Sequence, residues 1–431
     1  MRLKQYISRH QTLVYSLLHQ LLLAVYGFAL LFLLFHLSSR EEAGRWLLFV
    51  SAISLADMVM HGFLQTPVIR LLSASDRSTD SINSMAANII AFALAIWSIL
   101  SISVLVANNY IDSELTRDLL WYPILGLLMI AYNAGWWINH ALSDFRSIFL
   151  QRVIFVVVSF SIILYSYITT NELLTQNIII SQIVAYLISN IISWLKIRKL
   201  RPTVSQVKIA EQKYFFNYGK YTAGSMMMGS LLRNADIFMI AAFLGQAQVA
   251  VYSAAQKMVE IFEVVLRGLA AHSLPEFCKL KDSPKILLRQ YRKKTSQLML
   301  VFLVPSILMF IFSKEIIHLI SGSSQYSDAS IILKVFMVYV LFLIADRMTG
   351  VTLEAMGMAR HNFTKMIALM VVNITGNFIA LYYFRSLTGV AIVSIAATAS
   401  GVVLGAFFLI SHSGIAFRLK SVFPKLTMAG K

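Results

Sequence analysis

The stretch SMAANIIAFALAIWSILSISVLVA, residues 84–107, contains no Asp, Glu, Lys or Arg. A helix needs about 20 mainly apolar residues to cross the ~30 Å hydrocarbon core of a bilayer, and this stretch is long enough. A helix also satisfies its backbone hydrogen bonds internally, as a segment in lipid must. Strands of a membrane barrel would alternate apolar and polar residues over about ten positions, and this stretch does not. It therefore predicts a transmembrane helix.

The composition of the whole chain agrees with a membrane protein. The 431 residues are 58% hydrophobic and only 13% charged, whereas soluble domains carry about 25% charged residues. A soluble helical enzyme of this length would need a much larger polar surface. The composition therefore excludes that class.

Similar apolar blocks recur along the chain and predict about twelve transmembrane helices. Six cover residues 13–36, 46–70, 84–107, 119–139, 148–168 and 175–195, and six more cover 218–243, 249–275, 296–313, 330–352, 363–384 and 388–411. The expected fold class is an all-α integral membrane protein. The first block follows basic residues but is too long for a signal peptide, so we expect an uncleaved helix.

The basic residues between the predicted spans indicate the orientation. With the N-terminus inside, the external segments hold only Arg40, Arg45, Arg117, Lys314 and Arg385, while the internal ones hold basic runs in 196–220 and 279–294, together with Arg360 and Lys365. This positive-inside bias predicts that both termini are cytoplasmic. It also explains the net charge of +17, because internal basic residues face anionic headgroups. The charge therefore does not indicate nucleic-acid binding.

The longest internal segment divides the chain near its middle. We predict an N-terminal six-helix bundle over 1–195, a basic cytoplasmic linker over 196–217 and a C-terminal six-helix bundle with a cytoplasmic tail over 218–431. Both halves place a small-residue turn before an amphipathic helix that contains a proline, Pro67 or Pro275. Internal repeats of this kind are common in transporters. We therefore expect two bundles around a central polar cavity.

Charged residues within spans are costly, so they normally face a cavity or a partner. The eighth span carries the largest set, whose members share one face at 100° per residue: Lys257, Glu260, Glu263 and Arg267. Two interpretations stay open, a cavity-lining stripe or local pairs of Lys257 with Glu260 and of Glu263 with Arg267. In the second span, Asp57, His61 and Gln65 also share a face, at spacings of four.

Other spans hold smaller polar groups. Arg233 and Asp236 lie three residues apart in the seventh span, where pairing with each other is the simplest interpretation. Asp346 and Arg347 lie toward the cytoplasmic end of the tenth span, where an arginine can snorkel to the headgroups. Asn373 and Asn377 in the eleventh are typical of interhelical hydrogen bonding. The fourth span closes with Trp136, Trp137, Asn139 and His140, which are typical of an interfacial aromatic belt, and sugar stacking is the alternative interpretation.

Several kinds of chemistry have no support in the sequence. There is no glycine-rich phosphate loop, and the single cysteine, Cys278, and the scattered histidines have no metal-ligand spacing. The external segments are too short for a catalytic loop. We expect no enzyme activity, no metal and no cofactor. The residues favour a transporter with a polar cavity between two helical halves.

One stretch also resembles a known family. The sequence RNADIFMIAAFLGQAQVAVYSAAQK, residues 233–257, is similar to the start of the second half of polysaccharide flippases, although Ala250 replaces the family's usual glycine. The stretches EAMGMAR (354–360) and LTGVAIVS (387–394), with the two asparagines of the eleventh span, resemble later parts of the same family. The family belongs to the multidrug/oligosaccharidyl-lipid/polysaccharide exporter superfamily.

The resemblance implies a V-shaped pair of six-helix bundles. It also implies that the protein flips an undecaprenyl-pyrophosphate-linked oligosaccharide, such as an O-antigen repeat unit, from the cytoplasmic to the periplasmic leaflet of a bacterial inner membrane. The implied partners are this lipid-linked oligosaccharide, membrane lipids, and the polysaccharide polymerase and chain-length machinery. Arginine suits a pyrophosphate because its planar fork matches phosphate oxygens. Our candidates are Arg233, Arg267 and Arg347, then Lys257 and Arg70, with His61 and Gln65.

Two other functions stay open. A multidrug cation antiporter of the same superfamily typically uses a buried acid early in its first half, but the first span here has none, so Asp57 would have to serve. An integral membrane glycosyltransferase would need a catalytic loop. Ion coupling is a separate hypothesis for either transporter, since burial in the membrane favours protonation of a carboxylate. The candidate carboxylates are Asp57, Asp236, Glu260 and Glu263.

Overall fold

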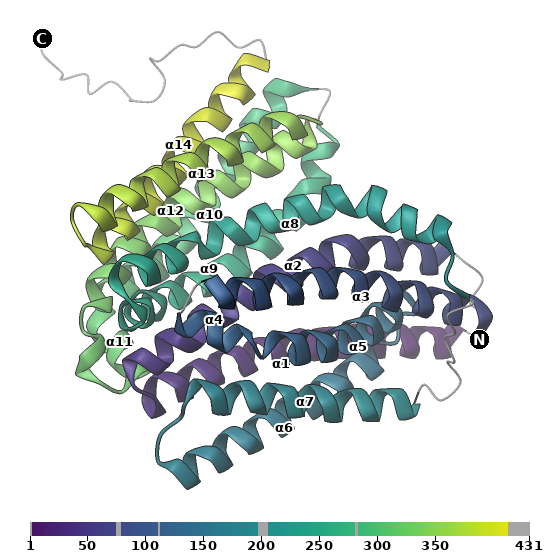
Figure 1. Cartoon of the computed structure of the whole chain (residues 1–431). Coiled ribbons are helices and arrows are strands. Elements are labelled where there is room, and N and C mark those ends of the chain that lie inside the picture. Colours follow the sequence, from purple (N-terminus) through teal and green to yellow (C-terminus); the bar gives the residue numbers. More distant parts are fainter. Residues whose placement is uncertain (1, 75–78, 111–112, 197–205, 281–282, 413–431) are drawn as a thin grey trace, which may run out of the picture. The chain divides into compact units, whose positions relative to one another are not determined.

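A computed structural model shows how the chain folds; it describes residues 2–74, 79–110, 113–196, 206–280 and 283–412. No strand occurs in these residues. The helices (Figure 1) are α1 (Arg2–Leu37), α2 (Arg40–Ala74), α3 (Thr79–Tyr110), α4 (Glu114–Leu119), α5 (Tyr122–Ala141), α6 (Phe145–Thr170), α7 (Thr175–Lys196), α8 (Ile209–Leu244), α9 (Gln246–Cys278), α10 (Pro284–Ile311), α11 (Ser313–Ser321), α12 (Ala329–Ala355), α13 (Ala359–Tyr382) and α14 (Leu387–His412).

Each of the twelve predicted spans corresponds to one long helix, which confirms the all-α membrane fold class. Nine helices of the described chain are long and apolar enough to cross a membrane by length and composition alone. The other three predicted spans correspond to α5, α7 and α9. Of these, α9 carries the charged residues noted in the sequence, which lower its mean hydropathy. The short helices α4 and α11 are additional elements between spans.

Contacts between helices divide the chain into two compact units. The first comprises Met1–Val251 with Ile320–Ser323, and the second comprises Tyr252–Leu319 with Ser324–Lys431. The division therefore falls within α9 rather than at the predicted linker 196–217, because α8 packs against α2 in the first unit. Within that linker, the described chain is helical from Ile209 onward. The proposed division into two six-helix bundles stays a prediction.

The core of the first unit forms around α2. Leu64, Val68 and Leu72 repeat every four residues on one face of this helix and are fully buried. They pack with side chains of α3, α5 and α8, including Trp137 and Phe215. A stripe at this spacing is what fixes one helical face against its neighbours. Because this face is fixed, three polar residues nearer the start of α2 also have a fixed orientation: Ser54, Asp57 and His61.

The second unit contains α9 from Tyr252 onward, α10, most of α11, α12, α13 and α14. Here α14 packs against both α12 and α13, and α12 packs against α10. Tyr252 of α9 is fully buried and stacks edge-on with Phe336 of α12, with ring centroids 5.5 Å apart. Gly245, between α8 and α9, has φ +89°, a conformation that favours glycine and allows the chain to turn.

Gly62 allows α2 and α8 to approach closely. A Cβ built on this glycine would overlap backbone atoms of Ala223 on α8, whereas one on Gly27 of α1 would meet nothing within 4 Å. Gly62→Ala is therefore expected to destabilise the protein by about 1–3 kcal/mol through overpacking. Gly27→Ala should stabilise it by up to about 1 kcal/mol, because alanine is the better helix former. Thermal unfolding of both variants in detergent measures this, and shifts of the same sign would contradict the close packing.

Candidate functional site

An acid and a histidine form the centre of a polar cluster in the first unit. On α2, His61 Nδ1 lies 3.3 Å from Asp57 Oδ1 and 3.2 Å from the Asp57 carbonyl oxygen. From α5, Asn133 Nδ2 donates a hydrogen bond of 3.0 Å to the same carboxylate oxygen. The Asp57 and His61 side chains are only partly exposed, at 24% and 19%. The predicted four-residue spacing therefore places both groups together, and α5 supplies a third.

Two tryptophans of α5 border this cluster. The His61 ring lies edge-on to Trp137, with centroids 5.2 Å apart and an interplanar angle of 80°. The Trp136 ring is farther away and tilted, with its centroid 6.4 Å from that of His61 and an interplanar angle of 46°. The predicted interfacial belt thus includes residues that pack against a polar group within the unit. Their rings fix the orientation of the imidazole, which is a suitable group for taking up or releasing a proton.

The polar cluster continues along the seam between α2 and α8. Asn234 of α8 donates to Ser54 Oγ at 3.4 Å and to the carbonyl oxygen of Ser230 at 2.9 Å. Further along, the Thr222 hydroxyl donates to the carbonyl oxygen of Gly62. The bonds to Ser54 and Gly62 join α8 to α2, and hydrogen bonds of this kind hold helices together in a membrane. We call Ser54, Asp57, His61, Asn133, Thr222 and Asn234 the polar seam.

Sequence reasoning did not identify Asn133 or Asn234 as site residues. Both lie within predicted spans, so a search for all amides in spans would have found them. Of the residues it did identify, Gln65 is partly buried on α2, while Arg233 is exposed and Asp236 is buried on α8. The side chain of Arg70 lies outside the described residues.

The charged face of α9 combines a local ion pair with an arginine that forms no ion pair among the described residues. Lys257 Nζ lies 2.7 Å from Glu260 Oε1, so the local ion pair between these two residues is present. Arg267 is exposed, and no ion pair joins it to another residue of the described chain. The pair weighed between Glu263 and Arg267 is therefore not formed. An arginine without a partner carboxylate can bind an anion with its full set of donors.

A second charge pair lies in the second unit, where the sequence did not predict it. Lys365 of α13 is 3% exposed. Its Nζ lies 2.7 Å from Asp346 Oδ1 and donates to the Asp346 carbonyl oxygen at 3.2 Å. The positive-inside argument counted Lys365 among the internal basic residues that face headgroups. The structure instead buries Lys365 against α12. The neighbouring Arg347 is exposed, without an ion-pair partner in the described residues.

These residues provide two kinds of chemistry. The Asp57–His61 pair can hold a proton or balance a cation. Arg267 and Arg347, both exposed in the second unit, can bind phosphate oxygens. Within the described residues, no group of three or more His, Cys, Asp or Glu side chains is placed to hold a metal ion.

Solved structures with the same fold are membrane transporters. An inward-facing multidrug resistance MATE family transporter of the MOP superfamily is 15% identical, with a TM-score of 0.73 over 91% of this chain and 96% of that chain. The lipid II flippase MurJ, in an inward closed conformation, is 15% identical, with a TM-score of 0.70 over 92% and 87%. A MOP superfamily transporter from Pyrococcus furiosus is 13% identical, with a TM-score of 0.59 over 94% and 93%.

Sequence comparison adds the family. No curated protein sequence matches this chain. Residues 36–331, more than half of the chain, match the sequence model of a family described as polysaccharide biosynthesis protein. This confirms the resemblance seen at residues 233–257, which lie inside the matched range. The chain therefore belongs to the polysaccharide biosynthesis protein family and shares its multi-pass helical fold with these membrane transporters.

Proposed function

We propose that the protein flips an undecaprenyl-pyrophosphate-linked oligosaccharide from the cytoplasmic to the periplasmic leaflet by alternating access. The observation that carries this proposal is the match of residues 36–331 to a polysaccharide biosynthesis family, on a fold shared with a lipid II flippase. A substrate with both a lipid tail and sugars would account for the link to polysaccharide assembly and for the likeness to a lipid flippase. The protein itself then catalyses no covalent chemistry.

The proposed substrate explains why cations belong in the spans. The lipid tail stays in the hydrocarbon, while the pyrophosphate and the sugars need a wet path with positive charge. Arg267 and Arg347 support this role because they are exposed and have no ion-pair partner among the described residues. Arg233 on α8 is the third candidate. A pyrophosphate offers each guanidinium the paired oxygens that it binds best.

We also propose how the helices are arranged and which membrane holds the protein. Two six-helix bundles, 1–195 and 218–431, would enclose a central cavity and rock about the linker 196–217. The membrane would be the bacterial inner membrane, with both termini in the cytoplasm. The polysaccharide polymerase and the chain-length machinery would receive the flipped oligosaccharide.

Loss of a single arginine is expected to impair flipping. Hydrogen bonds to charged groups contribute about 1.5–3 kcal/mol, so Arg233→Ala, Arg267→Ala and Arg347→Ala should each lower surface polysaccharide by about 10–100-fold. The assay is complementation of a flippase-deleted bacterium that carries the cognate sugar-assembly genes. Arg289→Ala is the matched control, since Arg289 is exposed on α10 in a segment predicted to be cytoplasmic.

The same assay tests the proposed function itself. Wild-type protein at normal membrane level that leaves lipid-linked oligosaccharide on the cytoplasmic face would refute flipping. Efflux of cationic dyes by such cells would then assign the chain to the antiporters, a function favoured by the likeness to the MATE family transporter. Wild-type activity in all three arginine variants would refute their role in binding the pyrophosphate.

Asp57 is our first candidate for ion coupling, because its carboxylate contacts both His61 and Asn133. Asp57→Asn should remove the dependence of flipping on an imposed proton or sodium gradient in proteoliposomes, since an amide neither exchanges a proton nor balances a cation. Asp144→Asn is the control, because an asparagine can also cap α6. Asp236→Asn, Glu260→Gln and Glu263→Gln test the other candidates. The coupling hypothesis is wrong if all four variants keep the ion dependence of the wild type.

A further inference from the structure

A cavity of about 220 Å³ lies in the first unit, between α2, α3 and the start of α5, beside α4. Its wall is almost wholly apolar, and three of its residues are alanines: Ala52 and Ala56 of α2 and Ala107 of α3. Thr116 and Leu119 of α4 also line it. The volume is that of about seven water molecules at ~30 Å³ each. An apolar cavity of this kind does not hold water, because water there has too few polar partners.

The cavity adjoins the surface of α3 that is suited to lipid. Ile99, Ile102 and Leu105 of this helix are 66%, 59% and 50% exposed. Leu100 and Val104, at intervening positions, line the cavity. Large apolar side chains exposed along a membrane-spanning helix face hydrocarbon. The cavity is partly open, so the medium that meets it is the interior of the bilayer.

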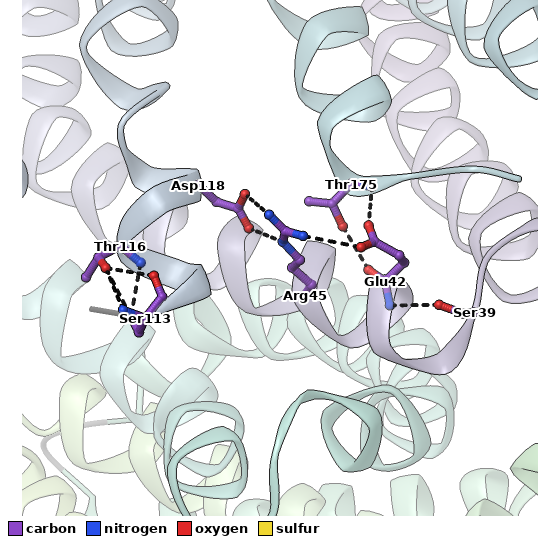
Figure 2. Close-up of polar contacts among 7 residues, drawn as sticks. All are labelled: Ser39, Glu42, Arg45, Ser113, Thr116, Asp118 and Thr175. Carbon is purple, nitrogen blue, oxygen red and sulfur yellow. Dashed lines mark hydrogen bonds and ion pairs between the residues drawn. The ribbon is translucent and has the colours of Figure 1, made fainter. Parts of the chain in front are cut away.

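The six-residue helix α4 is held rigidly at the cavity wall. Ser113 and Thr116 form a capping box at its start, in which each side chain accepts a hydrogen bond from the other's backbone N–H. Figure 2 shows that Asp118 of α4 is joined to Arg45 of α2. Because α4 is anchored in this way, the wall cannot simply collapse into the space. The cavity is a fixed feature of the first unit.

We infer that this cavity binds a segment of an acyl chain of a bilayer phospholipid. The wall selects hydrocarbon over water, and the volume admits part of one chain but not a headgroup. Phospholipid is the hydrocarbon present in large excess at the face of α3. The end of the cavity formed by α4 lies near Glu114 and Arg117, which suits the level of the headgroups. This inference does not depend on the proposed flipping activity.

Photocrosslinking in a bilayer tests the inference. The full chain is reconstituted in phosphatidylethanolamine and phosphatidylglycerol that contain a phospholipid with a diazirine in one acyl chain. Adducts in the wild type are expected to concentrate on residues that line the cavity. Ala107→Phe fills the cavity and should reduce these adducts several-fold. Ala95→Phe, at an exposed position of the same helix outside the cavity, is the matched control and should leave them unchanged.

Three outcomes would overturn the inference: adducts spread evenly along α3, equal adducts in Ala107→Phe and Ala95→Phe, or displacement of the cavity adducts by a small mole fraction of polyprenyl phosphate. The last would assign the cavity to an isoprenoid chain. Ala56→Phe fills the cavity from α2 and guards against a local effect on α3. Thermal unfolding of each variant shows that it is folded, so reduced adducts in both filling variants support the inference.

Discussion

Asp346→Ala is expected to destabilise the protein by about 3–5 kcal/mol, because it leaves the charge of Lys365 buried without its partner. The Lys365 side chain is 4% exposed and its Nζ lies 2.7 Å from the carboxylate that this change removes. Asp346 is itself 19% exposed, so little solvent screens the pair. The Asp346 carbonyl oxygen, which also accepts from Lys365 Nζ at 3.2 Å, would remain after the change, but a neutral acceptor does not balance the ammonium charge.

The double variant Asp346→Leu with Lys365→Met separates the charge from the packing. Replacing a buried ion pair by apolar residues of similar volume is often neutral or stabilising. The double variant should therefore unfold near the wild-type temperature, while each single change lowers it. Thermal unfolding in mild detergent measures all three proteins. If the double variant were as unstable as Asp346→Ala, the loss would come from shape rather than from an unpaired charge.

The long apolar helices could be predicted from sequence because each span is identified by the residues of one continuous stretch. Residues 84–107 alone show length, charge and periodicity, and α3 extends beyond them only by a few residues at each end. The start of α10 could not be seen in the same way. This helix begins at Pro284, twelve residues before the predicted span, because residues 284–295 are helical but basic. Hydropathy detects lipid-facing helix and not its charged extension.

The helix α4 shows a second limit of the sequence. Residues 114–121 joined the predicted fourth span or the loop before it, yet α4 ends at Leu119 and α5 begins at Tyr122. Pro123 lies in the first turn of α5, where it is tolerated because its missing N–H would have no partner in the helix. A proline at this position marks a helix start, and it could have located the boundary.

The candidate site divides in the same way between local and distant contacts. Asp57 and His61 could be placed together because four residues are about one helical turn. The partners Asn133 and Lys365 could not, since each contact joins different helices. One sequence supplies charge and periodicity but not which helices are neighbours. That is why Lys365 was counted with the internal basic residues, although it is buried against α12.

Arg45→Ala is expected to lower the free energy of unfolding by about 3–5 kcal/mol. Asp118→Ala should lower it less, by about 1–3 kcal/mol. Arg45 Nε and Nη2 donate to the two carboxylate oxygens of Asp118 at 2.6 and 2.7 Å, and Nη1 donates to Glu42 at 3.3 Å. The Asp118 side chain is 2% exposed and that of Arg45 18%. Removing the arginine therefore strands a buried carboxylate, whereas removing Asp118 leaves Arg45 paired with Glu42.

The order of the two effects is the sharper part of this prediction. Figure 2 shows why Glu42 stays in place without Arg45: its carboxylate accepts from the backbone N–H of Thr175, and its carbonyl oxygen accepts from the Thr175 hydroxyl. The stability of Arg45→Lys should lie between those of the wild type and Arg45→Ala. An ammonium keeps the positive charge but cannot form the bidentate pair of hydrogen bonds to Asp118. Unfolding midpoints of the three variants rank them. A lower midpoint for Asp118→Ala than for Arg45→Ala would show that Asp118 contributes packing of α4 beyond its charge.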